Sequence, residues 1–307
     1  MEANTEHLRT LVAVVDHGTF ERAAEALRVT PSAVSQRIKA LERQVGRVLV
    51  VRTKPATVTE PGQVLLRLAR QLALLESEAL ARLGSDSSGR RPAIPLVVNA
   101  DSLATWVLPA LAELTDVSFE LYLDDQDHST ARLRDGTVVG AVTSDPEPVQ
   151  GCVVQPLGSM RYRALGSTSF ADRWLPDGLT VEALGRSPMI VFDRKDTLQD
   201  RYLGMRGVSV HPPRHFVPAS SDFVRAAELG LGWAMIPDLQ SEELLRTGNL
   251  VDLDPERFID VPLFWQQWAV ESEQLARVAA ALSSASAARL RPSAPVRGRR
   301  RNSPLPR

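Results

Sequence analysis

The sequence predicts an α/β protein of 307 residues with an all-α-type N-terminal domain and one long linker helix between the two parts. Three observations predict this arrangement. Apolar residues recur at helical spacing through residues 6–45, one uninterrupted helical pattern covers residues 59–83, and from residue 94 onward short apolar runs alternate with helical patterns. Alternation of strands and helices is typical of α/β domains, and the length allows two or three compact units.

Residues 20–39 have the pattern of a helix–turn–helix that follows a first amphipathic helix at residues 6–15. Thr30 can cap the second helix of the motif by accepting a backbone N–H, and Pro31 fits the first helical position, where no N–H partner is needed. One face of this second helix is apolar, at Val34, Ile38, Leu41 and Val45. The other face carries hydrogen-bond donors and no acidic side chain, at Ser32, Ser35, Gln36, Arg37 and Lys39. Such a helix suits the phosphates and base edges of DNA; the alternative is an ordinary helical hairpin with a solvated polar face.

A short hairpin is predicted directly after this helix. Gly46 is a natural helix stop, and alternating valines between positions 48 and 58 indicate two short strands around Lys54. Arg52 and Lys54 then lie near the tip of the hairpin, where cations can contact the flanking DNA backbone. These features make residues 1–60 a winged helix–turn–helix domain. The residues predicted to contact double-stranded DNA are Thr30, Pro31, Ser32, Ser35, Gln36, Arg37, Lys39, Arg52 and Lys54.

One long linker helix is predicted at residues 61–84, with Thr59 as its cap and Gly84 at its end. Its length is about 37 Å, since an α-helix rises 1.5 Å per residue. Leucines alternate at steps of three and four, as in a coiled-coil seam, at Leu65, Leu68, Leu72 and Leu75. A stripe this narrow on a helix this long needs a partner, so we predict a homodimer through these leucines. The alternative is packing of the helix on its own domain.

The rest of the chain is predicted to form two similar α/β lobes. Residues 85–92 are polar and contain glycine, which marks a boundary, so the domain covers residues 92–290. Lobe I takes residues 92–161 and 268–290, and lobe II takes residues 162–267, with hinge strands around 154–160 and 265–270. We expect strands at 94–98, 117–123, 138–142, 161–165, 189–192, 233–236 and 263–270, and helices at 102–114, 129–135, 196–203, 220–230 and 274–290. Ligands of such folds bind in the crevice at the carboxyl ends of strands.

Charge is unevenly distributed along the chain, although the net charge is only −1. Residues 1–60 hold 9 Lys and Arg against 7 Asp and Glu, residues 61–288 hold 20 against 30, and residues 289–307 hold 7 against none. A cationic head on an acidic body suits a DNA reader that senses a cation, although an acidic body also serves solubility. Residues 291–307 are rich in Pro, Ser and Arg and are predicted to be a disordered basic tail, which either attracts phosphates or is only a solvated end.

Several classes of protein are not expected. The motifs G-x-G-x-x-G after a strand, G-x-x-x-x-G-K-S/T and H-E-x-x-H are absent, and the five histidines show no metal-ligand spacing. We therefore expect neither an enzyme nor a metal or other cofactor. Cys152 is the single cysteine, which fits a reducing compartment. No apolar run reaches the ~20 residues of a membrane span, and the acidic start is unlike a signal peptide. We expect a cytoplasmic protein associated with the nucleoid and with no membrane partner.

The chain resembles the LysR-type transcriptional regulators over nearly its whole length. The segments AAEALRVTPSAVSQRIKALE, NADSLATWVLPAL and LDDQDHSTARLRDGTVVGAVTSDPEPVQGCVVQPLG resemble specifically the ArgP/LysG branch of that family. The resemblance implies a winged helix–turn–helix, a linker helix and a periplasmic-binding-protein-like effector domain of two lobes. It also implies a dimeric or tetrameric DNA-binding regulator that responds to L-lysine or L-arginine, recruits RNA polymerase and controls a basic amino-acid exporter. The same branch was also named for inhibiting chromosome initiation.

Polar residues at strand ends and helix starts supply candidates for the effector site. Residues 99–102 open a helix whose free N–H groups, with the hydroxyl of Ser102, suit the α-carboxylate of an amino acid. The position of Ser102 also matches a ligand-contacting serine of the family. A dibasic amino acid brings two ammonium groups that need acceptors, whereas Asp and Ser at such places are otherwise ordinary caps. The effector candidates are Asp101, Ser102, Asp124, Asp125, Thr143, Asp145, Asp193, Ser221 and Asp222.

Three other functions stay open on the sequence. A protein that inhibits the initiation of chromosome replication by coating DNA would show little sequence preference and no response to amino acids. A regulator that senses a different small metabolite would keep the DNA specificity and lose the response to lysine and arginine. An α/β enzyme fused to a DNA-binding domain is the third alternative.

Overall fold

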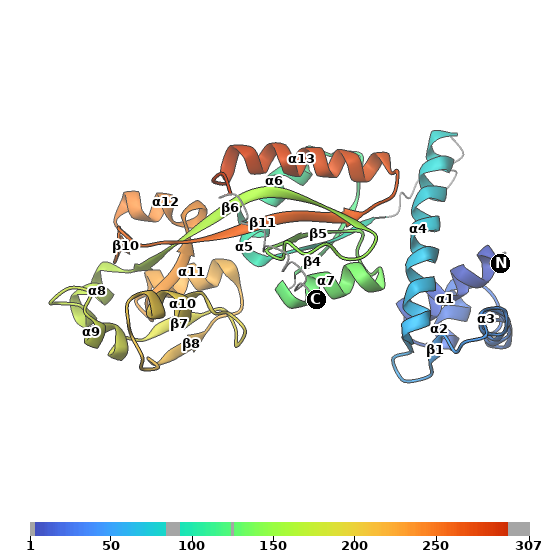
Figure 1. Cartoon of the computed structure of the whole chain (residues 1–307), viewed down its shortest axis with the longest axis horizontal. Helices are drawn as coiled ribbons and strands as arrows, with labels where there is room; N and C mark the ends of the chain where they lie inside the picture. The colour runs from blue at the N-terminus through green and yellow to red at the C-terminus, as the bar shows by residue number, and fades with distance from the viewer. Residues whose placement is uncertain (1–3, 84–92, 124–125, 294–307) are drawn as a thin grey trace, which may run out of the picture. The chain divides into compact units, whose positions relative to one another are not determined.

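The computed structural model describes residues 4–83, 93–123 and 126–293 (Figure 1). The chain divides into two units. Unit 1 contains Met1–Asn99, Glu113–Val154 and Trp265–Ala280, and unit 2 contains Ala100–Ala112, Gln155–Phe264 and Ala281–Arg307. The N-terminal helices therefore share a unit with the first strands of the α/β part.

Three helices open unit 1, and each begins at a side-chain cap. α1 (Thr5–His17) is capped by Asn4 and α2 (Phe20–Leu27) by Thr19. α3 (Pro31–Val45) is capped by Thr30, whose hydroxyl accepts the N–H of Ala33 at 3.2 Å. It ends at Gly46, where φ is 70°, a left-handed conformation that glycine adopts without steric cost. The predicted helix–turn–helix, its Thr30 cap and its Gly46 stop are confirmed.

The hairpin and the linker helix follow as predicted. β1 (Val50–Val51) and β2 (Thr57–Val58) pair antiparallel, with Val50 opposite Val58. α4 (Glu60–Arg82) starts at Thr59, whose hydroxyl accepts the N–H of Gly62 at 3.2 Å and donates to the carbonyl of Val48 at 2.7 Å. Beneath the hairpin, the apolar faces of α1, α2, α3 and the start of α4 form one core. Full burial of each large aliphatic side chain in such a core stabilises the fold by about 1.5–3 kcal/mol.

A parallel sheet forms the α/β part of unit 1. β3 (Ile94–Val98) pairs with β4 (Phe119–Leu123) and with β5 (Gly140–Thr143), and α7 (Gln126–Asp135) connects β4 to β5. The end of β11 (Ile259–Trp268) continues this sheet beside β5, because the N–H of Trp268 donates to the carbonyl of Val139 at 3.1 Å. α13 (Glu273–Arg289) follows β11 and starts in unit 1.

Gly140 provides a test of how tightly this sheet packs. A Cβ at Gly140 would lie only 2.2 Å from the ring of Trp265. We expect Gly140→Ala to lower the free energy of unfolding by about 1–3 kcal/mol, because the ring must shift to make room. The control is Gly204→Ala in α10 (Leu198–Met205), where nothing lies within 4 Å of the new methyl group and alanine favours the helix. Chemical denaturation of both variants measures the difference, and equal stability of the two would contradict the expectation.

Unit 2 is built around the long strand β6 (Cys152–Gly166), which enters it from unit 1. β9 (Ala234–Pro237) and β10 (Val251–Asp252) pair antiparallel with β6, and β7 (Met189–Val191) pairs in parallel with β8 (Arg214–Phe216). The helices of this unit include α8 (Thr168–Trp174), α9 (Val181–Arg186), α10, α11 (Ser220–Glu228) and α12 (Asp238–Thr247). β11 leads back from unit 2 to unit 1, so the chain crosses between the units within β6 and β11.

The helix predicted at residues 102–114 has an irregular centre. It consists of α5 (Ala100–Ser102), the π-helical segment η1 (Leu103–Val107) and α6 (Leu108–Ala112), all in unit 2. A π-helical turn inserts one extra residue and frequently occurs at functional sites. This one directly follows two of the effector candidates, Asp101 and Ser102.

Some elements differ from the sequence analysis. β6 is one continuous strand from Cys152 to Gly166, where the sequence predicts a hinge strand around 154–160 and a separate strand at 161–165. α12 was not predicted; its buried residue is the polar Ser241, and Leu244 and Leu245, which pack against the core of unit 2, are only partly buried. α8, α9, β8 and β10 are short and were not predicted either. Arg291, expected as the first residue of the disordered tail, instead exchanges two backbone hydrogen bonds with Ser159 of β6, at 2.8 and 3.0 Å. Residues 294–307 of that tail lie outside the described residues.

Candidate functional site

Helix α3 has one buried and one exposed face. Val34, Ile38 and Leu41 are fully buried in the N-terminal core. The polar side chains predicted to contact DNA lie at the surface, with Thr30, Pro31, Ser32, Gln36 and Lys39 exposed and with Ser35 and Arg37 half-buried. The apolar spacing of α3 thus determines which side chains remain available to a partner.

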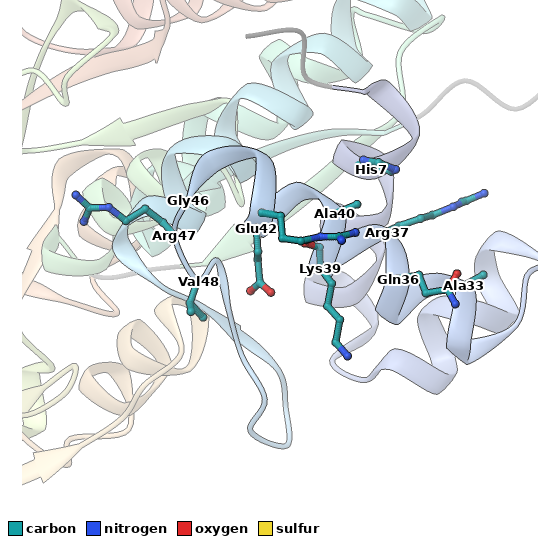
Figure 2. A pocket seen from close by; sticks show the side chains of 11 residues that line it. His7, Ala33, Gln36, Arg37, Lys39, Ala40, Glu42, Gly46, Arg47 and Val48 are labelled. Atoms are coloured by element: carbon teal, nitrogen blue, oxygen red, sulfur yellow. The ribbon is translucent and has the colours of Figure 1, made fainter.

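A hollow of about 900 Å³ runs along the flank of α3 (Figure 2). Gln36, Arg37 and Lys39 line it, as the sequence analysis anticipated for a contact surface. Two further cations line it that the sequence analysis did not select, Arg43 and Arg47. Both follow Lys39 at roughly helical spacing, a signal that was visible in the sequence. Four cations around one hollow suit the phosphates of a polyanion.

Glu42, the one carboxylate among the described residues that line this hollow, already has partners. Glu42 Oε1 accepts the backbone N–H groups of Leu49 and Val50, at 3.0 and 3.4 Å. These bonds attach the start of the hairpin to α3. Glu42 therefore orients the hairpin, and its charge is partly balanced by N–H dipoles, so the hollow stays favourable for an anion.

Arg37 is oriented by α1. Its guanidinium lies 3.2 Å from a carboxylate oxygen of Glu6, and its side chain is only 26% exposed. The sequence pattern predicts Arg37 as a free donor on the exposed face. The ion pair instead fixes the arginine beside α1 and makes contact with a DNA phosphate compete with Glu6.

The hairpin presents its cations from a fixed position. Arg52 stacks its guanidinium over the ring of Phe20, 4.9 Å from the ring centre, and Lys54 is exposed at the tip. Thr53 donates its hydroxyl to the carbonyl of Pro55 at 2.7 Å, which closes the tip. The stacking of Arg52 on the first residue of α2 sets the hairpin against the helix–turn–helix, a role of Phe20 that the sequence analysis missed.

α4 carries an exposed apolar stripe beyond the N-terminal core. Leu68, Leu72 and Leu75 are 39%, 40% and 37% exposed. Leu65 does not belong to this stripe, because only 7% of it is exposed and it is buried in the N-terminal core. For Leu65 the alternative of packing on its own domain is correct. Leu65 and Leu66, in the first turns of α4, are buried in that core, so the free stripe starts at Leu68.

Asp101 is the centre of a hydrogen-bond network inside unit 2. Its carboxylate accepts the hydroxyl of Tyr162 at 2.8 Å and the hydroxyl of Ser220 at 2.7 Å, and Gln240 donates to Ser220 at 2.8 Å. Burial raises the pKa of Asp101 above its ordinary value, against the lowering effect of the two hydroxyl donors, and the charge of Asp196 adds to the increase. Among the described residues no Lys, Arg or His forms an ion pair with this carboxylate.

Ser102 lies next to Asp101 and is fully buried. Its hydroxyl has no hydrogen-bond partner among the described residues, and neither has the indole N–H of Trp106 on the same helix. A buried hydroxyl without a partner costs free energy, so it requires a water or a ligand. Asp101 and Ser102 together therefore offer an acceptor for a cation beside an unused hydroxyl.

The other effector candidates that the structure describes have partners or positions of their own. Asp193 accepts the N–H groups of Lys195 and Asp196, and Asp145 accepts the N–H of Glu147, so both stabilise turns. The hydroxyl of Thr143 accepts the N–H of Asp145, and these two residues belong to unit 1, whereas Asp101 belongs to unit 2. Ser221 and Asp222 are exposed in the first turn of α11, and Asp124 and Asp125 lie outside the described residues.

Two family models match the chain, one over its N-terminal helices and one over its α/β part. Residues 5–63 match the bacterial regulatory helix-turn-helix protein of the lysR family, and residues 87–287 match the LysR substrate binding domain. The chain belongs to the LysR family of transcription regulators.

This LysR-type regulator is similar to proteins of one branch of the family. It is 48% identical over 274 residues to the HTH-type transcriptional regulator LysG of Mycobacterium tuberculosis, an alignment that covers 88% of this chain and 89% of that protein. It is 43% identical over 302 residues to the lysine export transcriptional regulatory protein LysG of Corynebacterium glutamicum, with 94% and 100% covered. The predicted LysG/ArgP type is confirmed.

Solved structures agree with this assignment. The crystal structure of ArgP from Mycobacterium tuberculosis has a TM-score of 0.87 and 46% identity, covering 94% of this chain and 98% of that one. Full-length LysG from Corynebacterium glutamicum with bound effector Arg has a TM-score of 0.79 and 40% identity, covering 94% and 100%. The predicted order of a helix–turn–helix, a linker helix and an α/β effector domain is therefore that of full-length relatives.

The family assignment also confirms two predictions about the class of protein. LysR-type regulators bind DNA and are not enzymes, as the sequence analysis predicted. Over the described ranges, none of the helices is long and apolar enough to cross a membrane. Within the same ranges, no group of three His, Cys, Asp or Glu side chains is placed to hold a metal ion.

Proposed function

We propose that this LysR-type regulator binds an operator as a dimer, senses lysine or arginine in its effector domain and controls the gene of a basic amino-acid exporter. The names of its relatives support the regulated process, since one is a lysine export regulator. The effector Arg bound to full-length LysG supports the class of ligand. The network around Asp101 supports it independently, on the chemistry of this chain.

The observation that carries the proposal is the carboxylate of Asp101. A buried carboxylate that has only hydroxyl donors lacks most of the stabilisation that an opposite charge would supply. An ammonium group of a bound amino acid would provide that charge. The unused hydroxyl of Ser102 and the first N–H groups of the same helix lie beside Asp101 and would donate hydrogen bonds to the α-carboxylate. One helix start thus offers complementary groups to both ends of an amino-acid backbone.

DNA recognition follows from α3 and the hairpin. In this proposal Ser32, Ser35 and Gln36 reach base edges or nearby phosphates, and Thr30 and Pro31 set the start of the helix. Lys39, Arg52 and Lys54 contact phosphates. The guanidinium of Arg37 contacts both Glu6 and the DNA backbone. Two copies related by a dimer of α4 helices would place two α3 helices in successive major grooves.

Isothermal titration of the full-length protein with the twenty amino acids tests the sensing function. We expect heat with lysine or arginine and none with leucine. A flat panel would remove basic amino-acid sensing and favour a regulator of another metabolite or an inhibitor of replication initiation. Binding to operator and random DNA separates these two, because a coating protein prefers neither.

The cations of the hollow beside α3 give a second test. We expect Arg43→Gln together with Arg47→Gln to weaken binding to operator and random DNA alike. Because phosphate contacts release counterions, the slope of log K against log salt should fall by about 0.9 for each contact that is lost. Arg9→Gln is the control, since Arg9 pairs with Glu76 of α4 and does not line the hollow. An unchanged slope in the double variant would remove Arg43 and Arg47 from the interface.

The raised pKa of Asp101 predicts how effector affinity depends on pH. A ligand ammonium needs the ionised carboxylate, so we expect full affinity above this pKa and a decrease of roughly tenfold per pH unit below it. In the ligand-free protein, the folding stability depends on pH in the opposite direction. A folded pKa above the unfolded one gives a stabilisation that is present at low pH and is lost as pH rises through the folded pKa. Titration calorimetry and thermal melts over a pH series measure both, and affinity independent of pH would contradict the role of Asp101.

A further inference from the structure

Arg67 of the linker helix α4 reaches the α/β part of unit 1. Its guanidinium donates to the backbone carbonyls of Gln150 and Gly151, the latter at 2.8 Å, and lies 3.4 Å from the sulfur of Cys152. It also lies over the ring of Trp268, 5.9 Å from the ring centre. Cys152 is the first residue of β6 and Trp268 is the last residue of β11. Arg67 therefore contacts the unit 1 ends of both strands in which the chain crosses to unit 2.

Two glycines shape the surface that receives Arg67. Gly136 and Gly151 have φ of 81° and 71°, in the left-handed region that favours glycine. A Cβ at Gly136 would lie 3.2 Å from the Cα of Arg67 and 3.4 Å from the ring of Trp268, and a Cβ at Gly151 would lie 3.1 Å from the guanidinium. A side chain at Gly136 would press on the backbone of α4, and a side chain at Gly151 would displace the guanidinium of Arg67. This close fit distinguishes the contact from an ordinary surface ion pair.

Two neighbours of Arg67 on α4 extend the attachment. Arg70 pairs with Asp16 of α1, and Glu78 is buried and accepts the hydroxyl of Ser272. Glu78 also accepts the N–H groups of Glu273 and Gln274 at 3.3 Å, so a side chain of α4 caps the start of α13. The first turns of α4 lie in the core of the DNA-binding domain. One rigid helix thus connects that core to β6, β11 and α13.

We propose that Arg67 is a positioning residue that couples the effector site to DNA binding. The link runs through β6, because Tyr162 on that strand donates to Asp101 while Cys152 at its start contacts Arg67. A ligand that displaces the hydroxyl of Tyr162 from Asp101 breaks the hydrogen bond between β6 and α5, and β6 can then shift. Arg67 transmits that change to α4 and so to the spacing of the two α3 helices. This inference rests on the proposed sensing of a basic amino acid.

Arg67→Ala and Arg67→Lys in the full-length protein test the proposal. For the wild type we expect lysine to change the affinity for operator DNA within the usual range of about 5- to 150-fold. Arg67→Ala should reduce this change to less than about twofold, while the affinities for lysine alone and for DNA alone stay near those of the wild type. Arg67→Lys keeps the charge and loses the planar fork that reaches two carbonyls, so it should retain only part of the change. If Arg67→Ala does not fold, the response of Arg67→Lys to lysine tests the proposal.

Arg82→Ala is the matched control. Arg82 lies on the same helix and pairs with Glu273, but both side chains are largely exposed, at 67% and 64%, and such pairs contribute little. We expect this variant to respond to lysine as the wild type does. A wild-type response in Arg67→Ala would overturn the coupling role.

Hydrogen exchange separates this inference from the proposed effector. Without any ligand, the amides of residues 149–152 should exchange faster in Arg67→Ala than in the wild type or Arg82→Ala, because the carbonyls of that turn lose their donors. Unchanged exchange would overturn the attachment itself. If the wild type responds to no amino acid while exchange accelerates as expected, the proposed effector is wrong and the attachment of α4 by Arg67 stands.

Discussion

Leu72→Asp is expected to lower the affinity for an operator with two half-sites by about 100-fold or more, because binding through two linked sites exceeds binding through one by 10²–10⁴. Leu72 lies on the exposed stripe of α4 with Leu68 and Leu75. In the proposed dimer the two stripes face each other, so each new carboxylate would be buried without a cation, which costs several kcal/mol. Sedimentation velocity should show a monomer, and fluorescence anisotropy should show the loss of affinity.

Ala73→Asp is the control for Leu72→Asp. It introduces the same charge at the next position, which is exposed and lies about 100° away around the helix. We expect this variant to remain a dimer with wild-type affinity. The affinity of Leu72→Asp for a single half-site should also stay unchanged, since the N-terminal core does not contain Leu72. A dimeric Leu72→Asp protein with full operator affinity would show that dimers form elsewhere.

Asp101→Asn is expected to weaken the binding of lysine or arginine by about 100-fold, because loss of one partner of a buried charge pair costs 2–5 kcal/mol. The amide keeps the shape of the carboxylate and removes its charge. Operator binding without the amino acid should be unchanged, and addition of the amino acid should no longer alter it. Since burial raises the pKa of Asp101, removal of the charge should also raise the melting temperature of the ligand-free protein.

Asp222→Asn is matched to Asp101→Asn. It is the same chemical change at another effector candidate, which is exposed in the first turn of α11. Its effect on amino-acid affinity should stay within about twofold, because exposed charges in water contribute little. Equal losses in the two variants would indicate a site that uses both carboxylates. Full affinity in Asp101→Asn would remove Asp101 from the effector site.

The sequence predicts those parts of the fold whose signals are local. Thr30, Gly46 and Thr59 mark helix ends by hydrogen bonds and backbone angles within a few residues, and the structure has all three ends there. Periodicity also predicts which side of a helix is apolar. It does not say what covers that side, and for this reason Leu65 was assigned to the dimer stripe although its own domain covers it.

The network of the proposed effector site could only partly be predicted from the sequence. Asp101 and Ser102 stand out because they start a helix after a strand. Tyr162 and Ser220 meet Asp101 from positions 61 and 119 residues away, and no local pattern connects such residues. The same holds for Arg67, whose carbonyl partners lie 83 and 84 residues further along the chain. Conversely, Asp145 and Asp193 fit the pattern of strand ends and serve as turn residues, as most aspartates at such places do.

The π-helical segment η1 has a consequence for how this region can evolve. One additional residue in a helix rotates everything before it by about 100° relative to everything after it. Ala110 and Leu111 pack into the interior from the far side of η1, while Asp101 and Ser102 are aimed from the near side. Removal of one residue between Leu103 and Val107 would restore a regular helix and turn the acid and the hydroxyl toward different neighbours. A deletion at this turn would therefore redirect two groups of the proposed effector site.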